Sequence, residues 1–284
     1  MIGEEMDVRL LNRLEFENSK ALWAKCFGDG EGFIEFYYRS RTRPEYVLGA
    51  FDGASLIGMI HMRPMKMVFD GSVRNICFVA GVCTDPEYRN RGVCTKLFKS
   101  AYPIMEERGF DASVLQPFDP AFYERLGYRT YIERQELTLI NGAGNTLYDR
   151  IDNAIRPYNA QQIKELYDGF IKKFEGASLR DEKYFEGFIE EYSATDARLT
   201  VNENGCSAGY TEDGTFFVDE LFFKDGTDVL TLLPPGFSKY VFPLPVSLEA
   251  PAGCSSSLVK FSMIRPIKAG FPEKRNDTYG FDRY

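Results

Sequence analysis

The stretch from Val79 to Lys99 constrains the fold of this chain more than any other part of the sequence. An apolar run, Ile76–Cys83, has the length and composition of a buried strand. A short basic loop follows it, and a helix begins after Gly92. The apolar positions of this helix repeat at helical spacing, at Val93, Leu97, Ala101, Ile104 and Met105. A strand that enters a helix through a tight loop is typical of α/β architectures.

The rest of the first half alternates between segments with the apolar pattern of a strand and segments with that of a helix. Asp-Gly pairs suit the positive backbone angles of tight turns between strands. We predict a strand–helix–helix–strand–strand–strand–helix–strand–helix–strand order. Ser19 is expected to cap the first helix, which ends near Gly28, and Pro103 is expected to kink the third. The predicted segments are Val8–Leu11, a helix through Ala21–Phe27, Phe33–Tyr38, Tyr46–Phe51, Leu56–His61, Met65–Phe69, Ile76–Cys83, the helix after Gly92, Ala112–Leu115, Pro120–Leu126 and Tyr131–Ile140.

After a linker at residues 141–145, the same order of elements begins again. The repeat predicts two helices, a hairpin around Asn204-Gly205 and a strand Phe216–Phe223 that follows Asp213-Gly214. The segment Gly253–Ser257 is interpreted as a loop. We therefore predict an α/β (α+β) fold of two mixed sheets flanked by helices. Residues 1–143 form the first domain, and residues 144–284 form a degenerate second domain with a C-terminal tail.

Composition narrows the classes of partner. The net charge is −8, which argues against a nucleic-acid partner, because proteins that bind phosphate backbones usually present a basic face. The start of the chain lacks a basic and apolar leader, and no apolar run is long enough to span a membrane. The six cysteines form no C-x-x-C pair, and the single histidine is His61, so we expect reduced thiols, a cytoplasmic location and no metal site.

We expect the functional site at the loop between the strand Ile76–Cys83 and the helix that begins after Gly92. The first N–H groups of a helix have no partner within the helix, and the helix dipole adds positive potential there. A pyrophosphate fits such a position, and Arg89 and Arg91 add charge while Gly92 lets a ligand approach the backbone. On spacing alone, a surface loop with two solvated arginines is an equal alternative. The second half has Lys224–Thr227 at this point, without the basic residues, so we expect no phosphate site there.

The sequence VCTDPEYRNRGVCTKLF resembles the acetyl-CoA-binding motif of the GNAT superfamily of N-acetyltransferases. The family pattern Arg/Gln-x-x-Gly-x-Gly/Ala is matched by Arg89, Gly92 and Cys94, of which Cys94 departs from the usual Gly or Ala. A second block, from Leu115 to Tyr128, resembles the segment with Pro-Phe and Phe-Tyr pairs of the Eis-like (enhanced intracellular survival) branch. Members of that branch follow the first acetyltransferase domain with a degenerate second copy. This chain ends before the sterol-carrier-like third domain of that branch.

The resemblance implies a set of cofactor contacts for acetyl-CoA. The pantetheine arm would lie along Val82, Cys83 and Thr84. The loop and first helical turn would hold the pyrophosphate, through Arg89, Asn90, Arg91, Gly92, Val93, Cys94 and Thr95. Phe118 and Asp119 would flank the thioester.

The resemblance also implies the catalytic groups. Tyr123 matches the general acid of the family, although its alternative role is a core aromatic beside Phe122 and Tyr128. The general base is open between the C-terminal carboxylate of Tyr284, His61 and water. No metal takes part in the implied direct attack of an amine on the thioester.

Three functions remain compatible with the sequence. The first is an acetyl-CoA-dependent N-acetyltransferase that acts on a small-molecule or protein amine. The second is a non-catalytic acyl-CoA sensor or scaffold, and the third is a tandem acyltransferase that takes aminoacyl groups from tRNA. The acidic balance argues against the third. The Eis-like resemblance also implies a homo-oligomer.

Overall fold

The structure is a computed structural model of the chain, and it describes residues 6–140, 158–194, 197–271 and 278–279. The chain forms two compact units. Of the described residues, unit 1 contains 6–131 and 262–271, and unit 2 contains 132–140, 158–194, 197–261 and 278–279. The predicted domain boundary between residues 143 and 144 lies outside the described residues.

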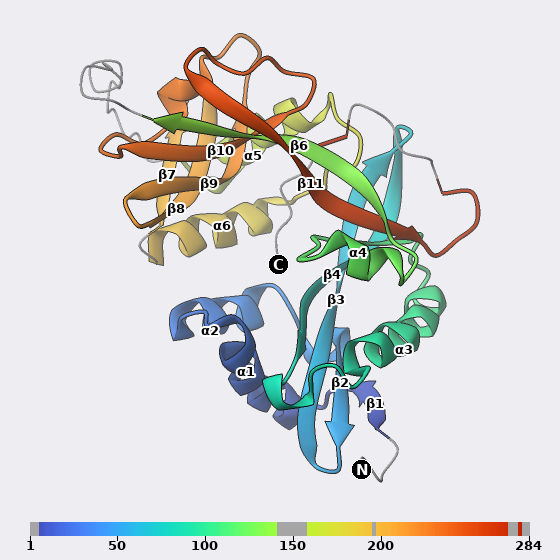
Figure 1. Cartoon of the computed structure of the whole chain (residues 1–284). Coiled ribbons are helices and arrows are strands. Elements are labelled where there is room, and N and C mark those ends of the chain that lie inside the picture. Colours follow the sequence, from blue (N-terminus) through green and yellow to red (C-terminus); the bar gives the residue numbers. More distant parts are fainter. Residues whose placement is uncertain (1–5, 141–157, 195–196, 272–277, 280–284) are drawn as a thin grey trace. The chain divides into compact units, whose positions relative to one another are not determined.

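Unit 1 has the order of elements that the sequence predicts for the first half (Figure 1). Its strand β3 is longer than expected, because the chain stays extended through Pro64, which pairs with Cys77 of the next strand. The elements are β1 (Asp7–Leu10), α1 (Arg13–Phe27), α2 (Glu31–Ser40), β2 (Val47–Asp52), β3 (Ser55–Phe69), β4 (Ser72–Thr84), α3 (Val93–Glu107), β5 (Ala112–Leu115), α4 (Pro120–Glu124) and the start of β6 (Arg129–Ile140). Helix α3 continues through Pro103 to Glu107.

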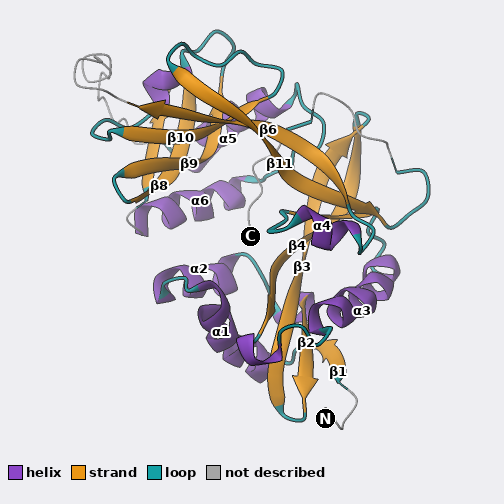
Figure 2. Cartoon of the chain, viewed as in Figure 1, coloured by secondary structure: helices purple, strands orange, loops and turns teal. Residues whose placement is uncertain are grey.

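The sheet of unit 1 has the strand order β1-β2-β3-β4-β5-β11, and its last strand comes from the far end of the sequence. Strands β1 to β4 are antiparallel neighbours, and β5 lies parallel to β4. The end of β11 (Cys254–Pro266) pairs antiparallel with β5 through Met263–Pro266. Figure 2 shows α1 and α2 on one side of β3 and β4 and α3 on the other. Each side has its own buried cluster, centred on Trp23 and on Leu97.

Helix α1 begins earlier than the sequence predicts. Asn12 caps it, and Asn12 and Glu15 form a reciprocal capping box, which satisfies donors that Ser19 was expected to satisfy. Ser19 lies inside the helix, where its hydroxyl donates to the Phe16 carbonyl and contacts the Tyr38 hydroxyl at 2.9 Å. The prediction of a Ser19 cap is therefore wrong.

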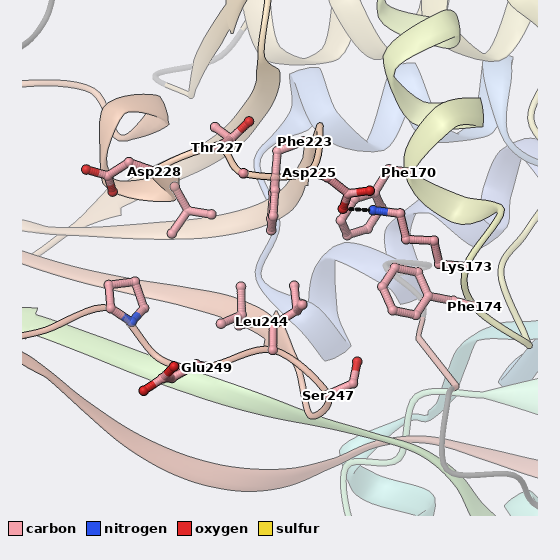
Figure 3. Close-up of a pocket in the computed structure, with 14 residues that line it drawn as sticks. Phe170, Lys173, Phe174, Phe223, Asp225, Thr227, Asp228, Leu244, Ser247 and Glu249 are labelled. Atoms are coloured by element: carbon pink, nitrogen blue, oxygen red, sulfur yellow. Dashed lines mark hydrogen bonds and ion pairs between the residues drawn. The ribbon is translucent and has the colours of Figure 1, made fainter.

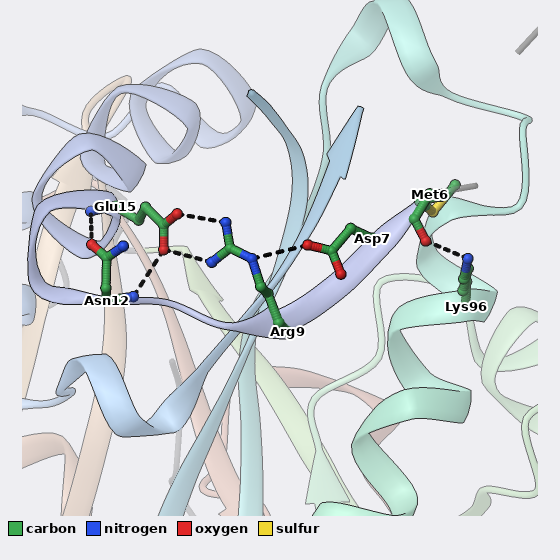
Figure 4. A network of polar contacts seen from close by, with 6 residues as sticks. All are labelled: Met6, Asp7, Arg9, Asn12, Glu15 and Lys96. Carbon is green, nitrogen blue, oxygen red and sulfur yellow. Dashed lines mark hydrogen bonds and ion pairs between the residues drawn. The ribbon is translucent and has the colours of Figure 1, made fainter. Parts of the chain in front are cut away.

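Arg9 of β1 fixes this start to the sheet. Its guanidinium bonds both oxygens of Glu15, at 2.6 and 2.8 Å, and its Nε donates to Asp7 (Figure 4). On the other side of β1, the Lys96 ammonium of α3 donates to the Met6 carbonyl. Strand β1 is thus tied by polar contacts to the helices of both faces.

A bulge interrupts the pairing of β3 and β4. Met59 pairs with Cys83 and His61 pairs with Ala80, so Ile60 faces both Gly81 and Val82. Gly81 has φ of +54°, and a Cβ there would lie 2.6 Å from the Trp23 ring. The parallel pairing of β4 with β5 ends just before this bulge, since it covers only Ile76–Val79 of β4.

Unit 2 contains elements that the sequence predicts and two strands that it does not. The two helices are α5 (Ala160–Ile171) and α6 (Glu182–Ala194), and the sheet has the order β6-β10-β9-β8-β7. The strands are β7 (Arg198–Asn202), β8 (Gly205–Glu212), β9 (Thr215–Phe223), β10 (Lys239–Pro245) and the shared β6 and β11. The loop predicted for Gly253–Ser257 is wrong, since β11 begins at Cys254 and the Ser256 hydroxyl donates to the Gln135 amide oxygen of β6.

Local features of unit 1 recur in unit 2. Helix α5 begins with an Asn159–Gln162 capping box, as α1 begins with Asn12 and Glu15. Strand β9 has a bulge of one residue at Asp219, since Ala208 pairs with Glu220 and Gly209 with Val218. Strand β10 runs parallel to β9 but pairs with it only over Thr215–Phe217, before the bulge.

We predict that Gly81→Ala destabilises the protein more than Gly71→Ala. Both glycines have positive φ, so both variants acquire backbone strain, but only Gly81 lacks room for a Cβ. The overpacking against Trp23 is expected to lower the free energy of unfolding by about 1–3 kcal/mol beyond the loss in Gly71→Ala. Urea unfolding of the two variants measures the difference, and equal losses would show that Trp23 does not restrict the bulge.

Candidate active site

The edge of β4 beyond its pairing with β5 is the centre of the candidate site. The predicted pantetheine residues Val82, Cys83 and Thr84 all lie in this last part of β4. The Thr84 carbonyl accepts a weak bond from the Cys26 thiol at 3.6 Å and one from Arg89 Nε at 3.4 Å. Along Val82–Thr84, the edge of β4 on the β5 side has no pairing with β5. Its backbone N–H and C=O groups are therefore available to hydrogen-bond a ligand that carries amide groups.

The loop after β4 is exposed and held at its base by an ion pair. Asp85 accepts from the Glu87 N–H and bonds the Lys25 ammonium at 2.8 Å. The bond to the Lys25 ammonium is the main cause that lowers the pKa of Asp85. The short helix Pro86–Tyr88 follows, and the Arg91 guanidinium lies 5.1 Å from the centre of the Tyr88 ring. This contact holds a positive charge beside the loop.

The predicted phosphate-binding residues gather at the start of α3. Arg89, Asn90, Arg91 and Gly92 are exposed, and Val93 is buried in the helix base. Asn90 and Gly92 have φ of +63° and +79°. A Cβ on Gly92 would meet no atom within 4 Å, so its backbone angle, and not a crowded neighbour, explains the glycine in this structure.

The first turn of α3 leaves backbone donors available to a ligand. Gly92 is its N-cap, and no side chain caps the helix. The first intrahelical bond runs from the Lys96 N–H to the Gly92 carbonyl, so the N–H groups of Val93, Cys94 and Thr95 have no partner within the helix. Donors in this position favour an anion such as a phosphate.

The predicted thioester end lies on α4 and the segment before it. Phe118 is 74% exposed, although it is a large apolar side chain. Asp119 caps α4 by accepting from the Ala121 N–H. The Tyr123 ring is buried beside Phe98 of α3 and Phe118, with ring centres 5.9 and 5.4 Å away. Both the core role and the functional role foreseen for Tyr123 are compatible with this packing.

The Tyr123 hydroxyl accepts and donates no hydrogen bond within the described residues, which distinguishes it from its neighbour Tyr128. The Tyr128 hydroxyl bonds the Ser113 hydroxyl at 2.6 Å. Burial, with smaller contributions from Cys94 and Asp119, raises the pKa of Tyr123 well above its usual range. The phenol therefore keeps its proton at neutral and moderately alkaline pH and has that proton to give.

Two thiols meet beside the β4 edge. The neighbouring Cys83 thiol lowers the pKa of Cys26, and Arg89 lowers it further against the opposing effect of burial. Burial raises the pKa of Cys94 to about 12. Cys26 and Lys25 belong to the site although the sequence analysis did not select them. No motif surrounds them, and only the packing of α1 against β4 brings them to Thr84 and Asp85.

Of the two residues considered as the general base, His61 and Tyr284, the structure describes only His61. His61 is fully buried among Trp23, Tyr37 and Tyr38, and burial followed by Arg63 lowers its pKa to about 3. An imidazole with that pKa is a poor acceptor for the proton of an ammonium group. Tyr284 lies outside the described residues.

The described residues contain neither a candidate membrane span nor a candidate metal cluster. No helix there is long and apolar enough to cross a membrane. Likewise, no group of three or more His, Cys, Asp or Glu side chains in that part of the chain is placed to hold a metal ion.

Comparison with known proteins relates the first part of the chain to a family. Residues 7–131 match the family model described as an acetyltransferase (GNAT) domain. No curated protein matches the chain. A probable N-acyltransferase from Enterococcus faecalis V583 is similar in structure, with a TM-score of 0.70, 16% identity and coverage of 93% of this chain and 73% of that one.

Two further solved structures share the fold. Eis1 from Mycobacterium abscessus has a TM-score of 0.67 and 16% identity, over 92% of this chain and 74% of its own. A putative acetyltransferase from Pyrococcus horikoshii has a TM-score of 0.59 and 16% identity, over 96% and 92% of the two chains. The family match covers every element that carries the candidate site up to Tyr123, so the candidate site lies in the part of the chain that matches the GNAT acetyltransferase domain.

Proposed function

We propose that the chain is an N-acetyltransferase that moves an acetyl group from acetyl-CoA to an amine by direct attack. One observation carries the proposal. Within the described residues, the edge of β4 without a strand partner, the uncapped turn of α3 and the Tyr123 hydroxyl without a hydrogen bond all belong to residues 82–123 of one unit. The donors suit a pantetheine and a pyrophosphate, and the phenol suits a leaving thiolate. In this proposal Thr84, Gly92 and Thr95 bind through their backbones.

In the proposed reaction, Tyr123 and water carry out the proton transfers. Acetyl-CoA, when bound, supplies a thioester whose carbonyl carbon the amine attacks as the bond from carbon to sulfur breaks. Tyr123 donates its proton to the sulfur that leaves. The amine loses its own proton to water, and solvent returns a proton to the phenolate, so the charges balance. Water is preferred to His61 because of the low pKa of that imidazole.

Several accompanying features support the rest of the proposal. The recurring capping box, bulge and parallel pair favour a degenerate second acetyltransferase domain in unit 2, which lacks the basic loop. The six thiols are free, which favours the reducing cytoplasm. We propose a small-molecule or protein amine as acceptor, no nucleic acid or membrane as partner, and a homo-oligomer as the working form.

Gly92→Asp tests the phosphate site. The new carboxylate would repel the pyrophosphate at the start of α3, so we expect acetyl-CoA affinity to fall about a hundredfold. Gly71→Asp is the matched control, because Gly71 also has positive φ and open space but lies in the β3–β4 turn. Calorimetric titration with acetyl-CoA measures both. Unchanged affinity in Gly92→Asp would remove this loop from the cofactor site.

Tyr123→Phe tests the general acid. Removing the hydroxyl is expected to lower kcat about a hundredfold with acetyl-CoA affinity unchanged, because the ring and its packing remain. Tyr128→Phe is the control: it loses the bond to Ser113 and about 1 kcal/mol of stability, but keeps turnover. Release of coenzyme A with a panel of amines, followed by chromatography, gives kcat. Full turnover in Tyr123→Phe would exclude the acid role, and tight binding without turnover in the unmodified protein would favour an acyl-CoA sensor.

Alkylation of Cys26 tests the position of the pantetheine arm. Because its pKa is lowered, Cys26 is expected to react with iodoacetamide at neutral pH faster than Cys254, whose pKa burial raises. Bound coenzyme A should slow the reaction of Cys26 at least about tenfold and leave Cys254 unaffected. Mass spectrometry of the modified peptides reads both rates. Equal rates for Cys26 with and without coenzyme A would place the arm elsewhere.

A further inference from the structure

Unit 2 contains a cavity of about 450 Å³ at the ends of β9 and β10 (Figure 3). Phe223 from the end of β9 and Leu244 from β10 line it, together with Phe170 and Phe174 from α5 and the turn after it. All four side chains are at most 8% exposed. The volume lies in the range of small-molecule pockets, and the wall is apolar as such pockets require.

The cavity occupies the place in unit 2 that corresponds to the candidate site in unit 1. In each unit the first strand pairs with its parallel neighbour over a short stretch only, Ile76–Val79 in β4 and Thr215–Phe217 in β9, and a bulge follows that stretch. In each unit a lysine near the end of the first helix pairs with an aspartate in the loop after that strand. Lys25 pairs with Asp85, and Lys173 pairs with Asp225. The backbone opening of the first unit is therefore kept in the second.

The charges around the two openings differ. The opening in unit 1 is followed by Arg89 and Arg91 and by an uncapped helix of 15 residues. The loop of unit 2 runs through Gly226 into a single short turn, Val229–Leu232, in which the Leu230 N–H donates to the Asp228 side chain. That cap occupies the position at which an anion would bind, so this cavity is unsuited to a phosphate.

Acidic groups surround the mouth of the cavity. Its lining includes the carboxylates of Asp225, Asp228 and Glu249, against one ammonium, that of Lys173, which Asp225 already pairs. Figure 3 shows this ion pair on one side of the hollow and Asp228 and Glu249 on the other. Glu249 is exposed and forms no ion pair within the described residues. A ligand with a positive group and an apolar body therefore finds complementary partners at the mouth and at the wall.

We propose that this cavity binds an organic cation, with its alkyl or aryl body against Phe170, Phe223 and Leu244 and its ammonium or guanidinium group beside Glu249. The site is separate from the acetyl-CoA site in unit 1, and its occupancy does not depend on acetyl transfer. The apolar wall contributes most of the affinity, because burial of hydrocarbon surface is the larger favourable effect and exposed ion pairs contribute little. The carboxylates select the sign of the charge.

Calorimetric titration of the full chain with three matched probes tests the proposal. The probes are phenylbutylamine, phenylbutanol and phenylbutyrate, which share a body and differ in charge. We expect the amine to bind most tightly and the carboxylate about tenfold or more weakly. Glu249→Lys should weaken amine binding about fivefold and strengthen phenylbutyrate binding, because it replaces attraction by repulsion.

Glu212→Lys is the control for this charge reversal. Glu212 is exposed at the end of β8, outside the cavity lining, and the change in net charge is the same. Amine affinity should stay unchanged in this variant and in Tyr123→Phe, whose substitution lies in unit 1. The proposal is overturned if no probe binds, if amine and carboxylate bind equally, or if Glu249→Lys leaves amine affinity unchanged. The last outcome would assign amine binding to the acceptor site of unit 1 and would leave the acetyltransferase proposal intact.

Discussion

The separation of β4 from β5 is the constraint on which the rest of unit 1 depends. If the two parallel strands were hydrogen-bonded along the whole of β4, their backbone groups would bond each other and none would be available to a ligand. The bulge at Gly81 and Val82 changes the course of β4 while β3 continues to pair with it. Trp23 fills the space that a side chain on Gly81 would need, so the aromatic cluster of α1 and α2 packs against the bulge that follows the pairing of β4 with β5.

The same bulge explains why the two faces of unit 1 have different chemistry. On the α3 side, β4 leads directly into the loop and the uncapped helix, so backbone donors and arginines collect there. On the α1 and α2 side, the bulge backs onto Trp23 and His61, which are fully buried. His61 is therefore part of a packed aromatic layer, and the low pKa that burial gives it follows from its position against the bulge and not from a catalytic partner.

Much of this arrangement is readable from the sequence because it depends on local signals. The strand Ala112–Leu115, the helix after Gly92 and the turns at Asp52-Gly53 and Asp70-Gly71 were predicted, since periodicity and turn chemistry act within a few residues. The start of α1 was not, because Ser19 and Asn12 are both good capping residues. The choice between them depended on Glu15 and its bond to Arg9 of β1, a contact between two elements.

Strands β10 and β11 were missed for a different reason. Strand β10 carries Pro243 and Pro245, which count against a strand within a sheet, and the first residues of β11 are a run of serines. Both strands exist because of what they pair with. The end of β11 covers β5 in unit 1, and β10 lies between β6 and β9 in unit 2. The positions of Lys25 and Cys26 at the site could not be predicted from the sequence either, since only tertiary packing brings α1 to Thr84 and Asp85.

Comparison of the two units shows which features of the strand openings come from the backbone and which come from the side chains. Both have an opening between parallel strands, a bulge and a lysine–aspartate pair beside it. Only one has arginines and unmet N–H groups at the exit of the strand, whereas in the other Asp228 meets the N–H of Leu230. Since the backbone course is shared, the identity of the residues in one loop decides whether the opening favours an anion. On the proposal that unit 2 is a degenerate second acetyltransferase domain, substitutions in one loop account both for the absence of a phosphate site there and for a cavity suited to a ligand of the opposite charge.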